Sequence, residues 1–134
     1  MLKTVVAANV AANTPFTIIV PGTEIWTVLA VAATLSRAAG GVPTRALRLA
    51  ISDGTRTVLT SPAADAGTEP GTLTATWTNA QPATSSSGGT GVTLGPLPTV
   101  TLLPGYSIVG TVIGGVAADQ WTTASVWVDF RVSG

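Results

Sequence analysis

The stretch RALRLAISD, at residues 45–53, decides the fold class because its large apolar residues alternate with polar or small ones. In an extended chain successive side chains point to opposite faces, so a two-residue period predicts a β-strand with one buried face. The residues of the expected buried face are Leu47, Leu49 and Ile51. Arg48 then lies on the opposite face, where water solvates its charge.

The pair Asp53-Gly54, directly after this strand, predicts a hairpin turn. Asp-Gly pairs favour type I′ turns, in which both central residues have positive φ. We therefore expect residues 45–53 to pair with residues 56–61.

The same alternation predicts two further strands, at residues 72–79 and 125–132. Their expected buried residues are Leu73, Ala75 and Trp77 in the first, and Val126, Val128, Phe130 and Val132 in the second. Threonines occupy the opposite face of the first strand, and their branched side chains suit a pleated sheet. In the second strand Trp127 is unusual, because it points outward together with Asp129 and Arg131.

Two longer stretches, IWTVLAVAATL at residues 25–35 and YSIVGTVIGGV at residues 106–116, are apolar on both expected faces. The first contains many alanines, but its β-branched residues and the turn pairs that flank it favour a strand over a helix. Strands of this kind lie in the centre of a sheet or are covered by a partner subunit. Weaker strands are expected at residues 14–20, 56–61 and 99–103.

Turn-forming pairs such as Pro21-Gly22 recur about every eight to twelve residues, which is the spacing of a sandwich or barrel. We therefore predict an all-β, single-domain protein, an antiparallel β-sandwich of jelly-roll type with about eight strands. A small antiparallel barrel is the second choice. Residues 1–13 form an N-terminal arm or first strand. Residues 14–134 form the sandwich, with a flexible loop at the polar, low-complexity residues 80–91.

Low charge is the main compositional feature, since 9% of residues are charged, 46% are hydrophobic and six basic residues balance six acidic ones. An ordinary soluble domain has about 25% charged residues and a net charge away from zero. So little charge indicates a protein whose outside is covered in an assembly. The same neutrality argues against nucleic-acid binding, which needs clustered Lys and Arg. Every apolar run is shorter than the roughly 18 residues of a membrane span, so no membrane partner is expected.

Catalytic and cofactor chemistry have few candidate residues. The chain has no histidine and no cysteine, which excludes Ser-His-Asp catalysis, Cys-His catalysis and thiolate metal sites. No feature of the sequence brings two carboxylates together for glycoside hydrolysis. Asp65, Glu69 and Asp119 offer oxygen ligands for calcium, but their wide spacing favours solvated loop charges. We therefore expect no catalytic, cofactor-binding or metal-binding residues, and no enzyme.

The four tryptophans are the remaining candidates for binding. Trp26 and Trp77 fall on expected buried faces and are interpreted as core residues. Trp121 and Trp127 are expected to be exposed. Because tryptophan is enriched at interaction hot spots, we predict that both take part in a subunit contact. Stacking on a sugar ring is the alternative role.

Three segments carry a resemblance to a known family. They are IIVPGTEIWTVLAVAATL at residues 18–35, GPLPTVTLLPGYSI at residues 95–108 and AADQWTTASVWVDF at residues 117–130. In this order they resemble small bacteriophage particle proteins with jelly-roll-like folds, of the capsid decoration or head-associated type. The resemblance implies a β-sandwich that attaches to a shell, or to another head or tail component, without a cofactor. The match departs at residues 80–91 and at Phe130-Arg131, and it carries over no functional residue.

Together with the low charge, this resemblance predicts a structural virion protein, a capsid decoration or cement protein that stabilises the phage head as a homotrimer. The expected partners are the major capsid protein or other virion proteins. The expected location is the virion, assembled in the host cytoplasm. A receptor- or carbohydrate-binding module of a tail or fibre is the alternative function. On the first hypothesis, residues 1–13 and 80–91 reach over neighbouring subunits.

Overall fold

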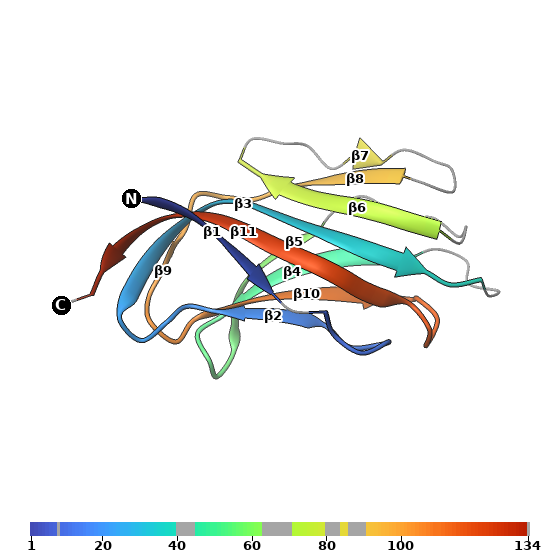
Figure 1. The fold of residues 1–134 in the computed structure, drawn as a ribbon, viewed down its shortest axis with the longest axis horizontal. Helices are drawn as coiled ribbons and strands as arrows, with labels where there is room; N and C mark the ends of the chain where they lie inside the picture. Colours follow the sequence, from blue (N-terminus) through green and yellow to red (C-terminus); the bar gives the residue numbers. More distant parts are fainter. Residues whose placement is uncertain (8, 40–44, 63–70, 80–83, 86–90, 134) are drawn as a thin grey trace.

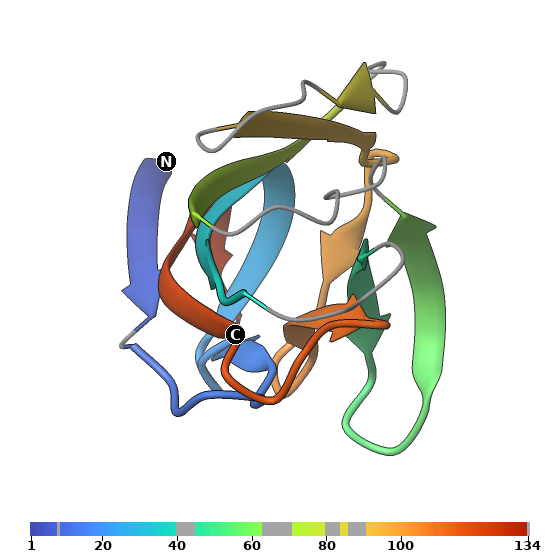
Figure 2. The same cartoon turned by 90° about the vertical axis from the view of Figure 1, so that its right-hand side faces the viewer.

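The computed structural model describes residues 1–7, 9–39, 45–62, 71–79, 84–85 and 91–133, and these residues form two facing β-sheets with no helix between them (Figures 1 and 2). The strands are β1 (Leu2–Ala7), β2 (Phe16–Ile19), β3 (Glu24–Arg37), β4 (Ala46–Ser52), β5 (Thr57–Pro62), β6 (Gly71–Thr78), β7 (Thr84–Ser85), β8 (Gly91–Pro96), β9 (Thr101–Leu102), β10 (Ser107–Ile113) and β11 (Gln120–Val132). The prediction of a single all-β domain is confirmed.

One sheet has seven strands in the order β1-β11-β3-β6-β8-β7, with β9 paired to β3, and the other has four in the order β2-β10-β4-β5. Almost all neighbouring strands run antiparallel, as expected, but β6 and β8 run parallel. The expectation of a purely antiparallel sandwich is therefore wrong at this pair. In the chain β7 comes between β6 and β8. It pairs antiparallel with the edge of β8 that faces away from β6, and β8 itself runs in the same direction as β6.

The core lies between the two sheets and is built from the alternating residues of both. The expected buried faces of β4 and β6 are confirmed, since their apolar residues are at most 2% exposed. These residues are Leu47, Leu49 and Ile51 in β4, and Leu73, Ala75 and Trp77 in β6. Arg48 points outward, as its place in the alternation requires.

β3 is the central strand of the larger sheet, with β11 on one side and β6 on the other. Its pairing with β11 shifts at one point, because Val128 lies opposite Val28 while Trp127 lies opposite Ala30. Leu29 is therefore an extra residue, a β-bulge, and it changes which residues of β3 point inward. Even-numbered residues are buried before Leu29 and odd-numbered ones after it. This change explains why residues 25–35 look apolar on both faces.

β11 contains a second bulge, at Thr122, because Trp121 lies opposite Leu35 and Thr123 opposite Thr34. The bulge turns Trp121 inward, where its side chain is 2% exposed, so the expected exposure of Trp121 is wrong. Val132 was expected to be buried and is 73% exposed. It lies opposite Glu24, the first residue of β3, at the end of the sheet where little of the core remains to cover it.

The hairpin between β4 and β5 forms as predicted, but its turn is not of type I′. Gly54 has a φ of 97°, whereas Asp53 is not among the described residues with positive φ. Instead, the Asp53 carboxylate accepts hydrogen bonds from the backbone N–H groups of Thr55 and Arg56, each at 2.9 Å. The loop that these hydrogen bonds stabilise is longer than the two-residue turn expected from the sequence.

The two ends of the described chain lie in neighbouring strands, since β1 pairs antiparallel with β11. Of the two forms considered for the N-terminal segment, the structure gives residues 2–7 the form of a first strand. Within the expected flexible loop at residues 80–91, only residues 84–85 and 91 are described, and they belong to β7 and β8. The remainder of that loop lies outside the described residues.

Candidate functional site: the outer sheet face around Trp127

Part of the outer face of the seven-stranded sheet, formed by β11, β3 and β6, carries no charged side chain, whereas Asp129 and Arg131 lie beyond it on the same side of β11. Residues directly opposite each other in neighbouring strands share a face. Three such rows cross this sheet: Trp127, Ala30 and Thr78; Ser125, Ala32 and Thr76; and Thr123, Thr34 and Thr74. All nine side chains are exposed or half-buried, whereas the residues between them are buried in the core. We call these nine residues the outer face.

Trp127 is the large apolar residue of the outer face and is 40% exposed. The bulge in β3 places Leu29, which is 39% exposed, beside it, and β1 adds Leu2, which is 72% exposed. These side chains border a shallow hollow of about 210 Å³. The hollow is lined by Leu2, Lys3, Thr4, Leu29, Trp127 and Val128. Trp127 is therefore available for contact with another molecule, as the sequence predicts.

Lys3 lines the hollow, but its charge is held away from the outer face. The Lys3 ammonium donates to both oxygens of Glu24, at 2.6 and 2.5 Å, and lies 4.5 Å from the centre of the Phe130 ring. The Trp26 indole N–H donates to the same carboxylate at 2.6 Å. The hydrogen bond from Lys3, followed by that from Trp26, holds the pKa of Glu24 below its ordinary value. The positive charge of Lys3 is thus neutralised by a carboxylate of the same chain.

Trp121, by contrast, belongs to the core and offers no surface for a partner or a sugar. Its ring meets Phe16 edge to face, with the ring centres 5.1 Å apart and the planes at 85°. Aromatic pairs prefer this arrangement, because the positive edge of one ring meets the negative face of the other. Trp26 and Trp77 are fully buried, so their interpretation as core residues is confirmed.

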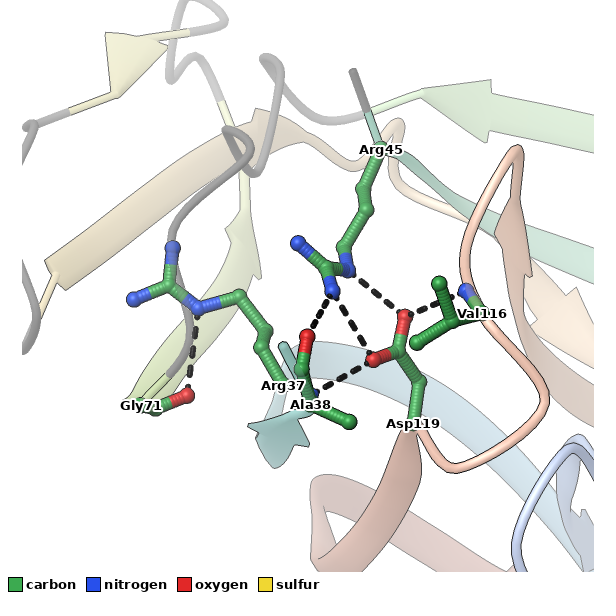
Figure 3. A network of polar contacts seen from close by, with 6 residues as sticks. All are labelled: Arg37, Ala38, Arg45, Gly71, Val116 and Asp119. Carbon is green, nitrogen blue, oxygen red and sulfur yellow. Dashed lines mark hydrogen bonds and ion pairs between the residues drawn. The ribbon is translucent and has the colours of Figure 1, made fainter. Parts of the chain in front are cut away.

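Arg45 and Asp119 form a buried ion pair (Figure 3). The Arg45 guanidinium donates to the two carboxylate oxygens at 2.6 and 3.0 Å and to the carbonyl of Ala38 at 2.6 Å. The backbone N–H groups of Ala38 and Val116 donate to the same carboxylate at 2.8 and 3.2 Å. The pair therefore joins the end of β3, the start of β4 and the connection between β10 and β11. Asp119 is not the solvated loop charge expected from the sequence.

Burial raises the pKa of Asp119, but hydrogen bonds from Arg45 and from the Ala38 backbone, with the positive charge of Arg45, outweigh it. The net result is a pKa below the ordinary value of an aspartate.

We expect the protein to lose stability in acid because of Asp119 and Glu24. Both carboxyls, and that of Asp53 through its hydrogen bonds from the backbone of Arg56 and Thr55, have lower pKa values in the folded chain, so the unfolded chain binds protons more readily. Their stabilisation is complete above the unfolded pKa values of about 4 and is lost as the pH falls through the folded values. Thermal unfolding between pH 7 and pH 2.5 should show a constant Tm down to about pH 5 and a steep fall below about pH 4.

Asp119→Asn is the control for this pH dependence. It should lower the Tm at neutral pH and flatten the acid branch, because one of the carboxyls whose pKa is lowered on folding is gone. An acid branch as steep as that of the wild type would show that Asp119 does not contribute to it.

Groups that could hold a metal ion are absent from the described residues, where no three His, Cys, Asp or Glu side chains lie together. Asp65 and Glu69 lie outside those residues, so their expected role as solvated loop charges stays a prediction. The described residues contain no helix of the length and hydropathy that crossing a membrane requires.

Comparison with known proteins does not assign this chain to a family. No protein-family model matches the sequence, and no curated protein matches it. The resemblance to phage particle proteins therefore stays a prediction, and the outer face is the ground on which a function is argued.

Proposed function

We propose that the protein is a structural component of a tailed-phage particle, a capsid decoration or cement protein without catalytic activity. On this proposal it binds the major capsid protein, or another virion protein, as a homo-oligomer that we expect to be a trimer. The single observation that carries the proposal is the uncharged outer face with Trp127 exposed on it. The finer fold class that we propose is a sandwich of jelly-roll type, supported by the two facing sheets and by the resemblance of the three segments.

The chemistry of the outer face favours permanent cover by another protein. Its rows consist of Thr, Ser, Ala and one Trp, so docking strips water from no charge. Interface centres are depleted of charged residues and enriched in aromatic ones, and Trp127 is placed as such an anchor. In a cyclic oligomer the same contact is repeated in every subunit. Several contacts of modest affinity then combine into a much higher overall affinity for the particle.

A charge placed on the outer face should therefore prevent attachment to the particle. We expect Thr74→Lys, in an exposed position of β6, to lower occupancy on stripped particles at least about tenfold, because a buried unpaired ammonium costs several kcal/mol. The measurement uses tailed-phage particles in which mass spectrometry detects the protein, stripped of it and incubated with purified variants. Cryo-electron microscopy then counts the occupied positions.

Thr60→Lys is the matched control, since Thr60 is an exposed threonine of β5 in the opposite sheet. It should bind like the wild type. Equal binding of both lysine variants and the wild type would show that the outer face does not attach the protein. Absence of the chain from all purified tailed-phage particles would overturn the particle assignment itself.

A carbohydrate- or receptor-binding module is the second candidate, and the hollow beside Trp127 is the observation that favours it. An exposed indole above a shallow apolar hollow suits stacking on a pyranose ring. A glycan array would then show specific binding that is lost in Trp127→Ala. Binding to no glycan, or unchanged binding by Trp127→Ala, would exclude this function for the hollow.

A further inference from the structure

β1 is the edge strand of the seven-stranded sheet, and among the described strands it pairs only with β11 (Figure 2, left). Two hydrogen bonds fix which of its backbone groups face β11. The N–H of Phe130 donates to the carbonyl of Met1 at 2.8 Å, and the Met1 nitrogen donates to the carbonyl of Phe130 at 3.1 Å. Met1 therefore turns its N–H and C=O side toward β11.

In an antiparallel pair the residues alternate between those that bond the neighbouring strand and those that point the other way. Because Met1 bonds β11, Lys3, Val5 and Ala7 do so too. The N–H and C=O groups of Leu2, Thr4 and Val6 consequently point away from β11, toward the open side of the sheet. The side chains of the same three residues are exposed, with Leu2 at 72% and Val6 at 65%.

This edge carries few of the features that keep natural edge strands from pairing with another chain. Those features are proline, a β-bulge, outward lysines and charges that point inward. β1 has neither proline nor a bulge in its register with β11. Its one charged side chain, Lys3, does point inward, but its ammonium is paired with Glu24 of the same chain and would keep that partner if the edge were covered.

We propose that β1 pairs with β1 of a second copy of this chain, antiparallel, about a twofold axis that passes midway between the two Thr4 residues. In this register Thr4 lies opposite Thr4 of the second copy, and Leu2 lies opposite its Val6. Directly opposed residues share a face, so the register has to match exposed side chains with exposed ones. Every outward N–H and C=O of Leu2, Thr4 and Val6 then has a partner.

A second copy is the occupant that fits, because the edge is complementary to itself. A twofold axis between two paired copies of a strand brings the central residue against the same residue, so any charge at that position would repel its copy. The centre here is a neutral threonine, and the opposed positions on either side are the apolar Leu2 and Val6. The two sheets would continue into one, and the two Trp127 side chains would stand on the same face, each beside its own Thr4. This contact does not depend on the phage assignment. It is also compatible with a trimer, because the β1 edge of each copy would then join that copy to one in another trimer.

Cysteine cross-linking tests the register directly, because the chain contains no cysteine of its own. In Thr4→Cys the two Cα atoms would be about 5.5 Å apart across the axis, within disulfide range. Mild oxidation of the purified protein at high concentration should convert most of it to a dimer on non-reducing gels. In Val6→Cys the two positions lie four residues apart along the pair, about 13 Å, so this variant should stay monomeric on the same gel.

A mixture of Leu2→Cys and Val6→Cys gives an independent check, because these positions are opposed in the proposed register. The mixture should cross-link to mixed dimers, whereas Val6→Cys alone should not. Circular dichroism confirms that each variant is folded. Cross-linking of Val6→Cys at the rate of Thr4→Cys, or of neither Thr4→Cys nor the mixture, would overturn the proposal. Both results concern the free protein in solution, so they are distinct from a failure to bind particles.

Discussion

Asp119→Ala is expected to lower the free energy of unfolding by about 3–5 kcal/mol, the largest effect of any single polar substitution considered for this chain. The substitution leaves the Arg45 guanidinium, which is fully buried, without its carboxylate. It also removes the acceptor for the backbone N–H groups of Ala38 and Val116. Urea denaturation monitored by tryptophan fluorescence measures the change, provided that both proteins unfold in one transition.

The control is Asp129→Ala, which removes the exposed ion pair with the Met1 ammonium at 2.6 Å. Exposed pairs contribute about 0–1 kcal/mol, so this variant should be nearly as stable as the wild type. A double variant, Arg45→Met with Asp119→Leu, should recover part of the loss, because the buried guanidinium is removed together with its carboxylate, while the N–H groups of Ala38 and Val116 still lack their acceptor. Equal effects of Asp119→Ala and Asp129→Ala would show that the buried network contributes no more than a surface pair.

Gly110→Ala is expected to cost about 3 kcal/mol, at the upper end of what an added core methyl group usually costs. Gly110 lies in β10 directly opposite Phe16 of β2. A Cβ atom at this position would lie 1.8 Å from Cε2 of the Phe16 ring. The ring is 1% exposed and packs edge to face on Trp121, so it cannot move aside without disturbing a second aromatic residue.

Two variants decide whether this steric reason is the correct one. Gly22→Ala should leave the Tm unchanged, because nothing lies within 4 Å of a Cβ at that position. Phe16→Leu should be destabilising alone but less so in the Gly110→Ala background, because the smaller side chain makes room for the methyl group. Additive effects of Gly110→Ala and Phe16→Leu would contradict the proposed clash.

The strands could be predicted from the sequence because alternation follows directly from burial of one face. It identified the buried residues of β4 and β6 and the outward position of Trp127. Alternation fails where the chain inserts a residue. Counted backward from Val126, Trp121 falls on the outer side, and only the bulge at Thr122 turns it inward. A bulge leaves no mark in a two-residue period, so the position of Trp121 could not be predicted.

The buried ion pair was missed for a different reason. Arg45 and Asp119 come from distant parts of the chain and meet only because β4 and β11 begin at the same end of the molecule. No local pattern separates such an aspartate from a solvated one. The outer face could be predicted in part, because the threonine positions of β6 were found, but its continuation over β3 depends on the bulge at Leu29.

The place of β11 between β1 and β3 also determines when the larger sheet can be completed during synthesis. β1 leaves the ribosome first among the described strands but has no partner in its sheet until β11 follows. Until then the edge of β3 that later pairs with β11 has no partner strand, and β3 is rich in apolar residues. Such long-range pairing slows folding and exposes strands to aggregation. Nascent chains that stall before β11 should therefore depend on chaperones more than the full-length chain does.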